Sequence, residues 1–183
     1  MRALAEAQFE RTEGGLVPQG DGWFVVNARD ARWFHSDDLG EYCGFEGDSR
    51  FPQLGININV LAPGQPMAMY HSEERQEDFL VVSGECTLVI EDEERPLRAW
   101  DFVHCPPGTA HVIVGAGESP AIVIAVGARA AGDHGLRYPV SESARKLGAG
   151  VDVETSEPRE AYARFERPVE RPYREGDLPN AVF

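Results

Sequence analysis

Cysteine is scarce in this sequence, which has three among its 183 residues: Cys43, Cys86 and Cys105. They are odd in number and widely spaced, and no two of them form a CxxC pair. Small secreted domains that depend on disulfides carry denser, even-numbered sets. The cysteines therefore argue against a disulfide framework and favour a reducing compartment, so we expect the protein to be cytoplasmic.

Long hydrophobic runs and positive charge are also scarce. No stretch approaches the ~18 uninterrupted apolar residues of a transmembrane helix, and residues 1–15 lack the apolar region of a signal peptide. Lysine and arginine number 17 against 31 aspartates and glutamates, which gives a net charge of −14. Because this charge repels phosphate backbones and anionic lipids, we expect neither nucleic acid nor a membrane as a partner.

The remaining composition is that of a soluble globular protein with one domain overall. Three segments differ in texture. Residues 1–53 read as an N-terminal packing arm, with a weakly helical start and a short strand at 23–26. Residues 54–128 form the predicted core, and residues 129–183 form a C-terminal extension with short helices and an extended tail.

Residues 54–128 have the pattern of a β-sandwich or barrel, because β-branched residues are dense and turn residues recur every 8–12 positions or so. Polar and apolar residues alternate in 56–60, and a further strand is expected at 67–71. In 77–82 the side chains of Glu77, Phe79 and Val81 share one face. The pattern predicts an all-β fold.

Two short helices are predicted in the extension. Ser141 stands where it can cap one helix, and Ser156 where it can cap a second over residues 157–165. The proline-containing segment 167–183 is expected to be extended.

The sequence also predicts a homodimer. Leu80 and Val82 place apolar side chains on the outward face of their strand, where they would be exposed to solvent in a monomeric barrel. Tyr173 and Phe183 of the tail are placed to anchor it to the barrel or to a second subunit, and a loose tail is the alternative.

Candidate metal ligands recur at strand spacing. His71 and Glu73 are two residues apart and so share one face of an extended strand. Glu77 opens the next strand, and a Pro-Pro-Gly turn at 106–108 leads to His111 at the start of another. Imidazole nitrogens with carboxylates suit one divalent ion such as manganese, iron, nickel or zinc.

These residues resemble the two motifs of the cupin superfamily, G(x)5HxH(x)3,4E(x)6G and G(x)5PxG(x)2H(x)3N. The matching positions are His71, Glu77, Gly84, Pro106, Gly108 and His111. The resemblance covers about residues 54–128 and is that of a small bacterial-type cupin. It implies a double-stranded β-helix, or jelly-roll barrel, with arms at both ends, and it assigns the family's metal ligands to His71, Glu77 and His111.

The sequence departs from the motifs at several positions. Glu73 replaces the second histidine, Trp100 and Gly115 replace the first glycine and the asparagine of the second motif, and Gly64 is one residue too far from His71. Glu73 is either a fourth ligand, which would give two histidines and two glutamates, or part of a solvated acidic run.

His104 has two interpretations. It either lines the pocket as an acid, a base or a further ligand, or it is a hydrogen-bonded strand residue that faces outward. Neighbouring Cys105 is interpreted as a small buried residue rather than a nucleophile.

The leading hypothesis is a cupin that binds one divalent metal and acts on, or binds, a small molecule. Oxygenase, isomerase and lyase chemistry all occur on this fold. The alternatives are a non-catalytic ligand-binding or sensing module and a metal-free structural cupin. No organic cofactor site and no catalytic residue beyond the metal ligands are identified.

Overall fold

β-Strands are the main secondary structure in residues 5–129 and 135–179, which the computed structural model describes. The first strands are β1 (Gln8–Arg11), β2 (Leu16–Gln19), β3 (Arg32–Ser36) and β4 (Gly40–Gly44). They are followed by β5 (Leu54–Leu61), β6 (Glu77–Ser83), β7 (Glu85–Ile90), β8 (Glu93–Arg98), β9 (Phe102–Cys105), β10 (His111–Ala116) and β11 (Ala121–Ala128). The C-terminal elements are α1 (Glu142–Lys146), α2 (Pro158–Ala161) and β12 (Val169–Glu170). The predicted all-β class with short helices is confirmed.

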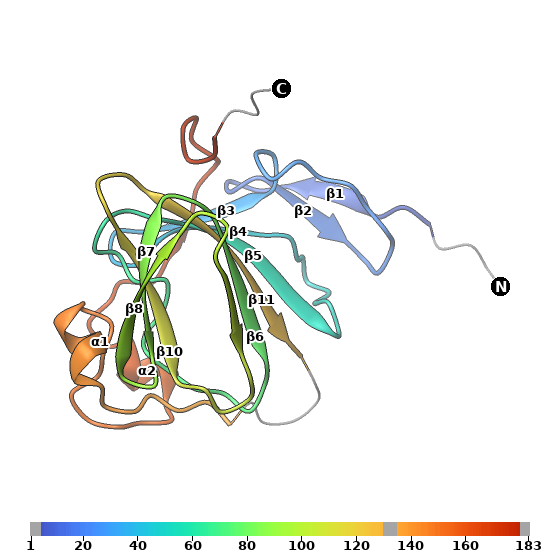
Figure 1. Ribbon diagram of the computed structural model, residues 1–183. Coiled ribbons are helices and arrows are strands. Elements are labelled where there is room, and N and C mark those ends of the chain that lie inside the picture. Colours follow the sequence, from blue (N-terminus) through green and yellow to red (C-terminus); the bar gives the residue numbers. More distant parts are fainter. Residues whose placement is uncertain (1–4, 130–134, 180–183) are drawn as a thin grey trace.

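Two sheets face each other and enclose the core (Figure 1). The larger sheet has the order β12-β3-β4-β5-β11-β6-β9, and the smaller has the order β10-β7-β8. Phe79 and Val123 from the larger sheet join Leu88 and Ile113 from the smaller one in a single buried cluster. This arrangement is the jelly-roll barrel that the sequence predicts.

Strand β6 shows the predicted alternation. Phe79 and Val81 are buried in the core, and Leu80 and Val82 lie on the other face. Val82 packs against a buried cluster that includes Trp33 of β3 and Ile122 of β11. Leu80 pairs with Phe102 of the edge strand β9, and Phe102 is 65% exposed. Part of the outer face is thus covered within one chain, and the homodimer stays a prediction.

The N-terminal segment differs from its prediction in two places. From residue 5, where the described part begins, its start is not helical, because β1 and β2 form an antiparallel hairpin. Residues 23–26 form no strand beyond an isolated bridge between Trp23 and Glu6. A helix confined to the first few residues would be marginal in water. Gly15, with a φ of 136°, lets the chain turn back beside Ala31.

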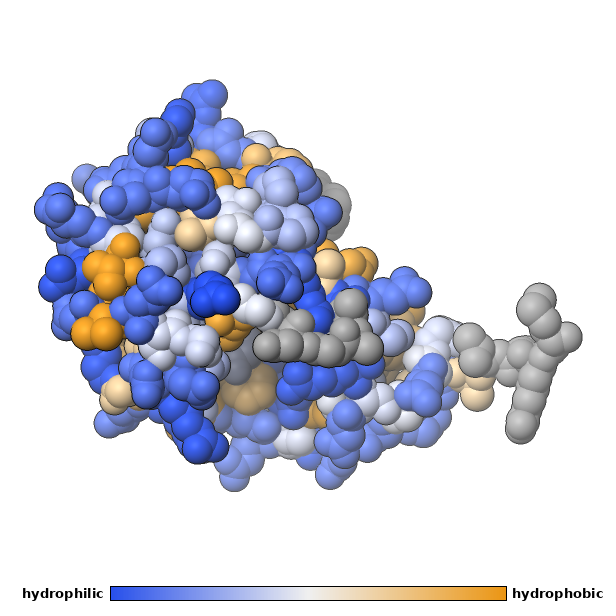
Figure 2. Space-filling view, turned by 90° about the horizontal axis from the view of Figure 1, so that it is seen from below, coloured by the Kyte–Doolittle hydropathy of each residue, from blue (hydrophilic) through white to orange (hydrophobic). Residues whose placement is uncertain are grey.

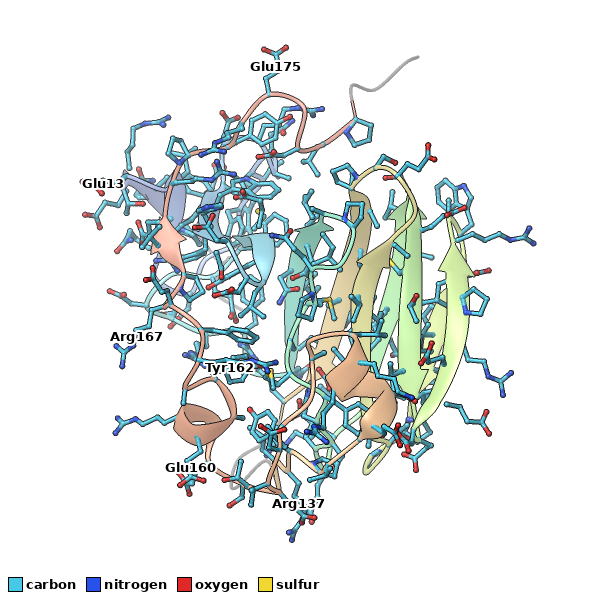
Figure 3. All side chains as sticks on the ribbon, turned by 90° about the vertical axis from the view of Figure 1, so that its left-hand side faces the viewer. Glu13, Arg137, Glu160, Tyr162, Arg167 and Glu175 are labelled. Atoms are coloured by element: carbon cyan, nitrogen blue, oxygen red, sulfur yellow. The ribbon has the colours of Figure 1, made fainter. Side chains whose placement is uncertain are left out.

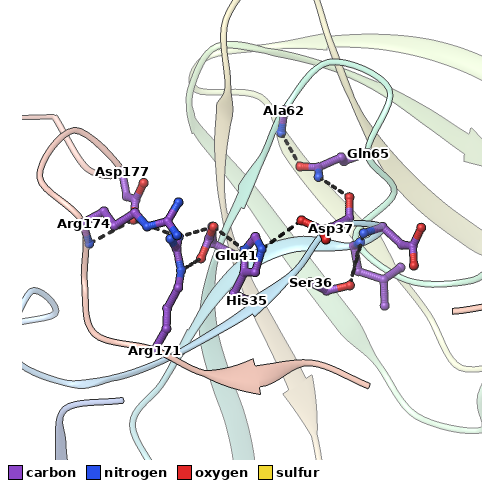
Figure 4. A network of polar contacts seen from close by, with 11 residues as sticks. His35, Ser36, Asp37, Glu41, Ala62, Gln65, Arg171, Arg174 and Asp177 are labelled. Carbon is purple, nitrogen blue, oxygen red and sulfur yellow. Dashed lines mark hydrogen bonds and ion pairs between the residues drawn. The ribbon is translucent and has the colours of Figure 1, made fainter. Parts of the chain in front are cut away.

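The C-terminal tail lies along β3 and β4 in a network of polar contacts (Figure 4). Arg171 donates through Nε to Glu41 Oε2 at 2.8 Å, and His35 Nδ1 lies 2.7 Å from the other oxygen of Glu41. Tyr173 packs on the buried ring of Trp33, with centroids 5.7 Å apart. The tail is therefore anchored to the same chain at Tyr173, while Phe183 lies outside the described residues.

Of the two predicted helices, the first begins where expected and the second does not. Ser141 caps α1, since its Oγ accepts the N–H of Ala144 at 3.0 Å. The second helix is only Pro158–Ala161, and Ser156 is not its cap. Its N-cap position is Glu157, which makes no side-chain capping bond. The hydroxyl of Thr155 accepts the N–H of Glu157 at 3.0 Å just before the helix.

No helix in the described ranges is long and apolar enough to cross a membrane. Seen from below, the molecule presents a largely hydrophilic surface with small, separate hydrophobic patches (Figure 2). This surface agrees with the large net negative charge of −14.

Candidate metal centre

A cavity of about 290 Å³ lies inside the barrel. Its walls come from β5, β6, β10 and β11, from the segment before β6, and from the C-terminal extension. The lining residues are Asn57, Asn59, Met67, Ala68, His71, Glu73, Glu77, Phe79, His111, Val112, Ala125, Leu136, Tyr138 and Tyr162.

Three predicted ligands converge at this cavity. Glu77 Oε2 lies 3.3 Å from Nε2 of His71 and 3.3 Å from Nε2 of His111. One side-chain atom from each residue falls in a group whose members all lie within 4.8 Å of one another. The structure therefore brings His71, Glu77 and His111 together as a group that could hold a metal ion.

Backbone pairing puts the two histidines side by side. The expected strand at 67–71 is absent, and His71 instead forms an isolated antiparallel bridge with His111. Each donates its backbone N–H to the carbonyl of the other, at 3.1 and 2.8 Å. Two directly bridged residues project to the same face of the pair, so the imidazoles meet without a regular strand.

The outer nitrogens of both imidazoles are fixed by backbone carbonyls. His71 Nδ1 lies 2.8 Å from the carbonyl of Met69, and His111 Nδ1 lies 3.0 Å from that of Thr109. Because a carbonyl oxygen can only accept, both Nδ1 atoms carry the proton. In the neutral rings Nε2 then has a free lone pair, which is the arrangement that orients metal-binding histidines.

Two inner atoms of the group lack hydrogen-bond partners. Glu77 Oε2 and His111 Nε2 are buried, and neither makes a hydrogen bond with any residue that the structure describes. Buried polar atoms without partners are costly, and a carboxylate oxygen facing imidazole lone pairs is unfavourable unless a proton or a cation lies between them. The donor set therefore fits a divalent cation with nitrogen and oxygen ligands.

The pKa values of the group point in the same direction. Burial raises the pKa of Glu77, but the adjacent His111 and His71 lower it by more than this rise. The resulting pKa of Glu77 is far below the usual range. Burial lowers the pKa of His71, but the charge and contact of Glu77, with smaller contributions from Met69 and Glu73, leave it above its ordinary value. The carboxylate is thus ionised, and the site attracts positive charge.

Glu73 lines the same cavity but lies farther from the centre. Its Oε1 is 4.0 Å from His71 Nε2. It is not one of the three residues whose ligand atoms come within 4.8 Å of one another. Its role as a fourth ligand stays a prediction.

His104 lies on the outer face of the barrel, next to Asp78 of β6. Its Nδ1 is 2.7 Å from Asp78 Oδ1, and its side chain is 51% exposed. Cys105, one residue on, is buried, and burial raises the pKa of its thiol to about 12. The thiol is therefore not an activated nucleophile.

Two residues of the cavity escaped the sequence-based prediction. Tyr138 and Tyr162 come from the C-terminal extension, and their rings meet edge to face with centroids 5.9 Å apart. The ring of Tyr138 also lies against His71, with centroids 6.1 Å apart. Both tyrosines stand far along the chain from the ligand motif, so no local spacing links them to it.

A family model described as "Cupin domain" matches residues 57–127. No curated protein shows significant similarity to the sequence.

Several solved structures resemble parts of the chain. A candidate sugar phosphate isomerase of Acidithiobacillus ferrooxidans is 30% identical, with a TM-score of 0.41 over 43% of this chain and 51% of its own. A cupin-superfamily sugar phosphate isomerase of Silicibacter pomeroyi is 26% identical, with a TM-score of 0.47 over 51% and 61%. The polyketide cyclase RemF of Streptomyces resistomycificus is 14% identical, with a TM-score of 0.49 over 57% and 78%. This chain thus spans between half and two thirds of the length of the two isomerases.

Proposed function

Because the chain belongs to the cupin superfamily through a domain at residues 57–127, we propose that its barrel binds one divalent metal ion and presents it to a small molecule. The ligands are His71, Glu77 and His111, and the ion is manganese, iron, nickel or zinc.

One observation carries this proposal. Glu77 Oε2 lies 3.3 Å from the inner nitrogen of each histidine, while carbonyls hold the outer nitrogens. A purely structural histidine would use its inner nitrogen in a hydrogen bond, whereas His111 Nε2 is buried without one among the described residues. The group is arranged as a set of ligands rather than as part of a core.

The residues around the centre have separate tasks. When bound, the metal would supply a Lewis acid that polarises a ligand oxygen. Glu77 balances part of the metal charge, and the carbonyls of Met69 and Thr109 keep the imidazoles neutral and oriented. Phe79 and Met67 supply an apolar wall that excludes water from the side of the cavity next to them.

Elemental analysis of protein reconstituted with each of the four metals tests the proposal. We expect the wild type to retain about one equivalent of at least one metal, and His111→Ala and Glu77→Ala to lose most of it, because each removes a ligand. His104→Ala is the matched control, since His104 pairs with Asp78 outside the cavity, and should retain the metal. Wild-type occupancy below about a tenth of an equivalent with all four metals would contradict the proposal.

A further inference from the structure

Tyr162 brings a hydroxyl group from the C-terminal extension to the cavity in the barrel. It directly follows α2, and Figure 3 shows it on the segment that lies against the barrel. The residue lies outside the family match at 57–127, yet it lines the same cavity as His71 and His111. The wall of the site is therefore incomplete without the extension.

The hydrogen bonds that Tyr162 makes leave its hydroxyl proton free to be donated. Its oxygen accepts the backbone N–H of Met69 at 3.1 Å. It also accepts from the phenol of Tyr138. Burial raises the pKa of both phenols, and this bond adds to the rise at Tyr138 and offsets part of the rise at Tyr162. A phenol oxygen has two lone pairs and one proton, so both acceptor positions are filled. Among the described residues no acceptor for that proton is found.

A hydroxyl group that lines a cavity and lacks an acceptor is a donor available to a ligand. We propose that the Tyr162 hydroxyl donates a hydrogen bond to a ligand bound at the metal, and so selects ligands with a second oxygen atom. The inference rests on the proposed metal site and deepens it, by assigning to residues outside the cupin domain a part in choosing the ligand.

The rest of the cavity narrows the class of ligand. Apart from the two histidines, the titratable groups with charge among its described lining residues are Glu73 and Glu77, which are both acidic. Together they cancel the charge of a divalent ion, so a highly charged substituent such as a phosphate gains no net attraction at the centre. Met67, Phe79 and Leu136 offer apolar contact instead. The fitting ligand is a small molecule of low charge, with two neighbouring oxygen atoms and a short apolar part.

Cobalt-loaded protein tests this inference through the visible absorption of the metal. The probes are acetohydroxamate, which offers two oxygens, and ethanethiol, which binds through sulfur and offers none. Tyr162→Phe should keep its cobalt but bind acetohydroxamate about tenfold more weakly, with ethanethiol affinity unchanged. Tyr173→Phe, the same change outside the cavity, should alter neither affinity.

The outcomes separate this inference from the metal site. Unchanged acetohydroxamate affinity in cobalt-loaded Tyr162→Phe, or equal weakening of both probes, overturns the role of Tyr162 and leaves the metal site standing. A wild type that takes up neither cobalt nor any of the four proposed metals overturns both. Inorganic phosphate provides a test in the wild type, independent of whether any variant folds: it should not displace acetohydroxamate, and displacement would overturn the proposed class of ligand.

Discussion

At the scale of single residues, Glu73 decides the charge of the centre. With His71, Glu77 and His111 a divalent ion keeps one net positive charge, whereas a fourth ligand at Glu73 would neutralise it. Glu73 lines the cavity and its carboxylate lies 4.0 Å from His71 Nε2, so a small movement would bring it to the ion. A substrate that binds as an anion would need the first arrangement.

Glu73→Gln distinguishes the two arrangements, because it keeps the volume and removes the charge. If Glu73 is a ligand, metal affinity should fall about tenfold or more, and Glu73→His should restore binding with a preference for softer ions. Metal titration by calorimetry measures both variants. Equal affinity in Glu73→Gln and wild type would establish a three-ligand site.

At the scale of elements, the α1 cap joins the extension to the barrel. Ser141 Oγ accepts the N–H of Ala144 and donates to Asp92 Oδ1 at 2.5 Å, in the turn between β7 and β8. Its side chain is 1% exposed. One hydroxyl therefore stabilises both the helix start and the contact between two parts of the chain.

Ser141→Ala should lower the free energy of unfolding by about 1–3 kcal/mol, because it removes a helix cap and leaves the buried N–H of Ala144 unpaired. Ser156→Ala is the matched control: this serine is exposed and caps no helix, so we expect a change within about 0.5 kcal/mol. Urea unfolding at neutral pH measures both. Equal effects would show that the Ser141 bonds do not contribute.

The sequence predicts the elements whose determinants are local. Alternation placed Phe79 and Val81 in the core, and motif spacing predicted that His71, Glu77 and His111 would lie together, as they do. It could not identify Tyr162, because that residue reaches the cavity only through the path of the extension. Nor could it place the start of α2, whose N-cap position is Glu157 and not Ser156.

At the scale of the whole molecule, stability should depend on pH in opposite ways with and without metal. The raised pKa of His71 means that its protonated form stabilises the metal-free protein below its unfolded pKa of about 6.5. This contribution is lost as the pH rises through the folded pKa. The lowered pKa of Glu77 adds stability above about pH 4.3, which is lost on further acidification. Metal binding instead requires the unprotonated imidazole.

The increase in Tm caused by metal should therefore be larger at pH 8 than at pH 6, since below the pKa of His71 the metal affinity falls about tenfold per pH unit. Differential scanning calorimetry of metal-free and metal-loaded protein at the two pH values measures it. An increase in Tm that is the same at both would argue against histidine ligation.

The pairing of β5 with β11 has a consequence for how the chain folds. Leu54–Leu61 pairs with Ala121–Ala128. The three proposed ligands all lie in the part of the sequence between these two strands. Such non-local pairing forms slowly, because the closure of a long loop must precede the contacts that stabilise it. His71 and His111 meet only through the pairing of distant segments, so we expect the metal ion to bind late in folding. Bound metal should therefore lower the rate of unfolding and leave the rate of folding nearly unchanged.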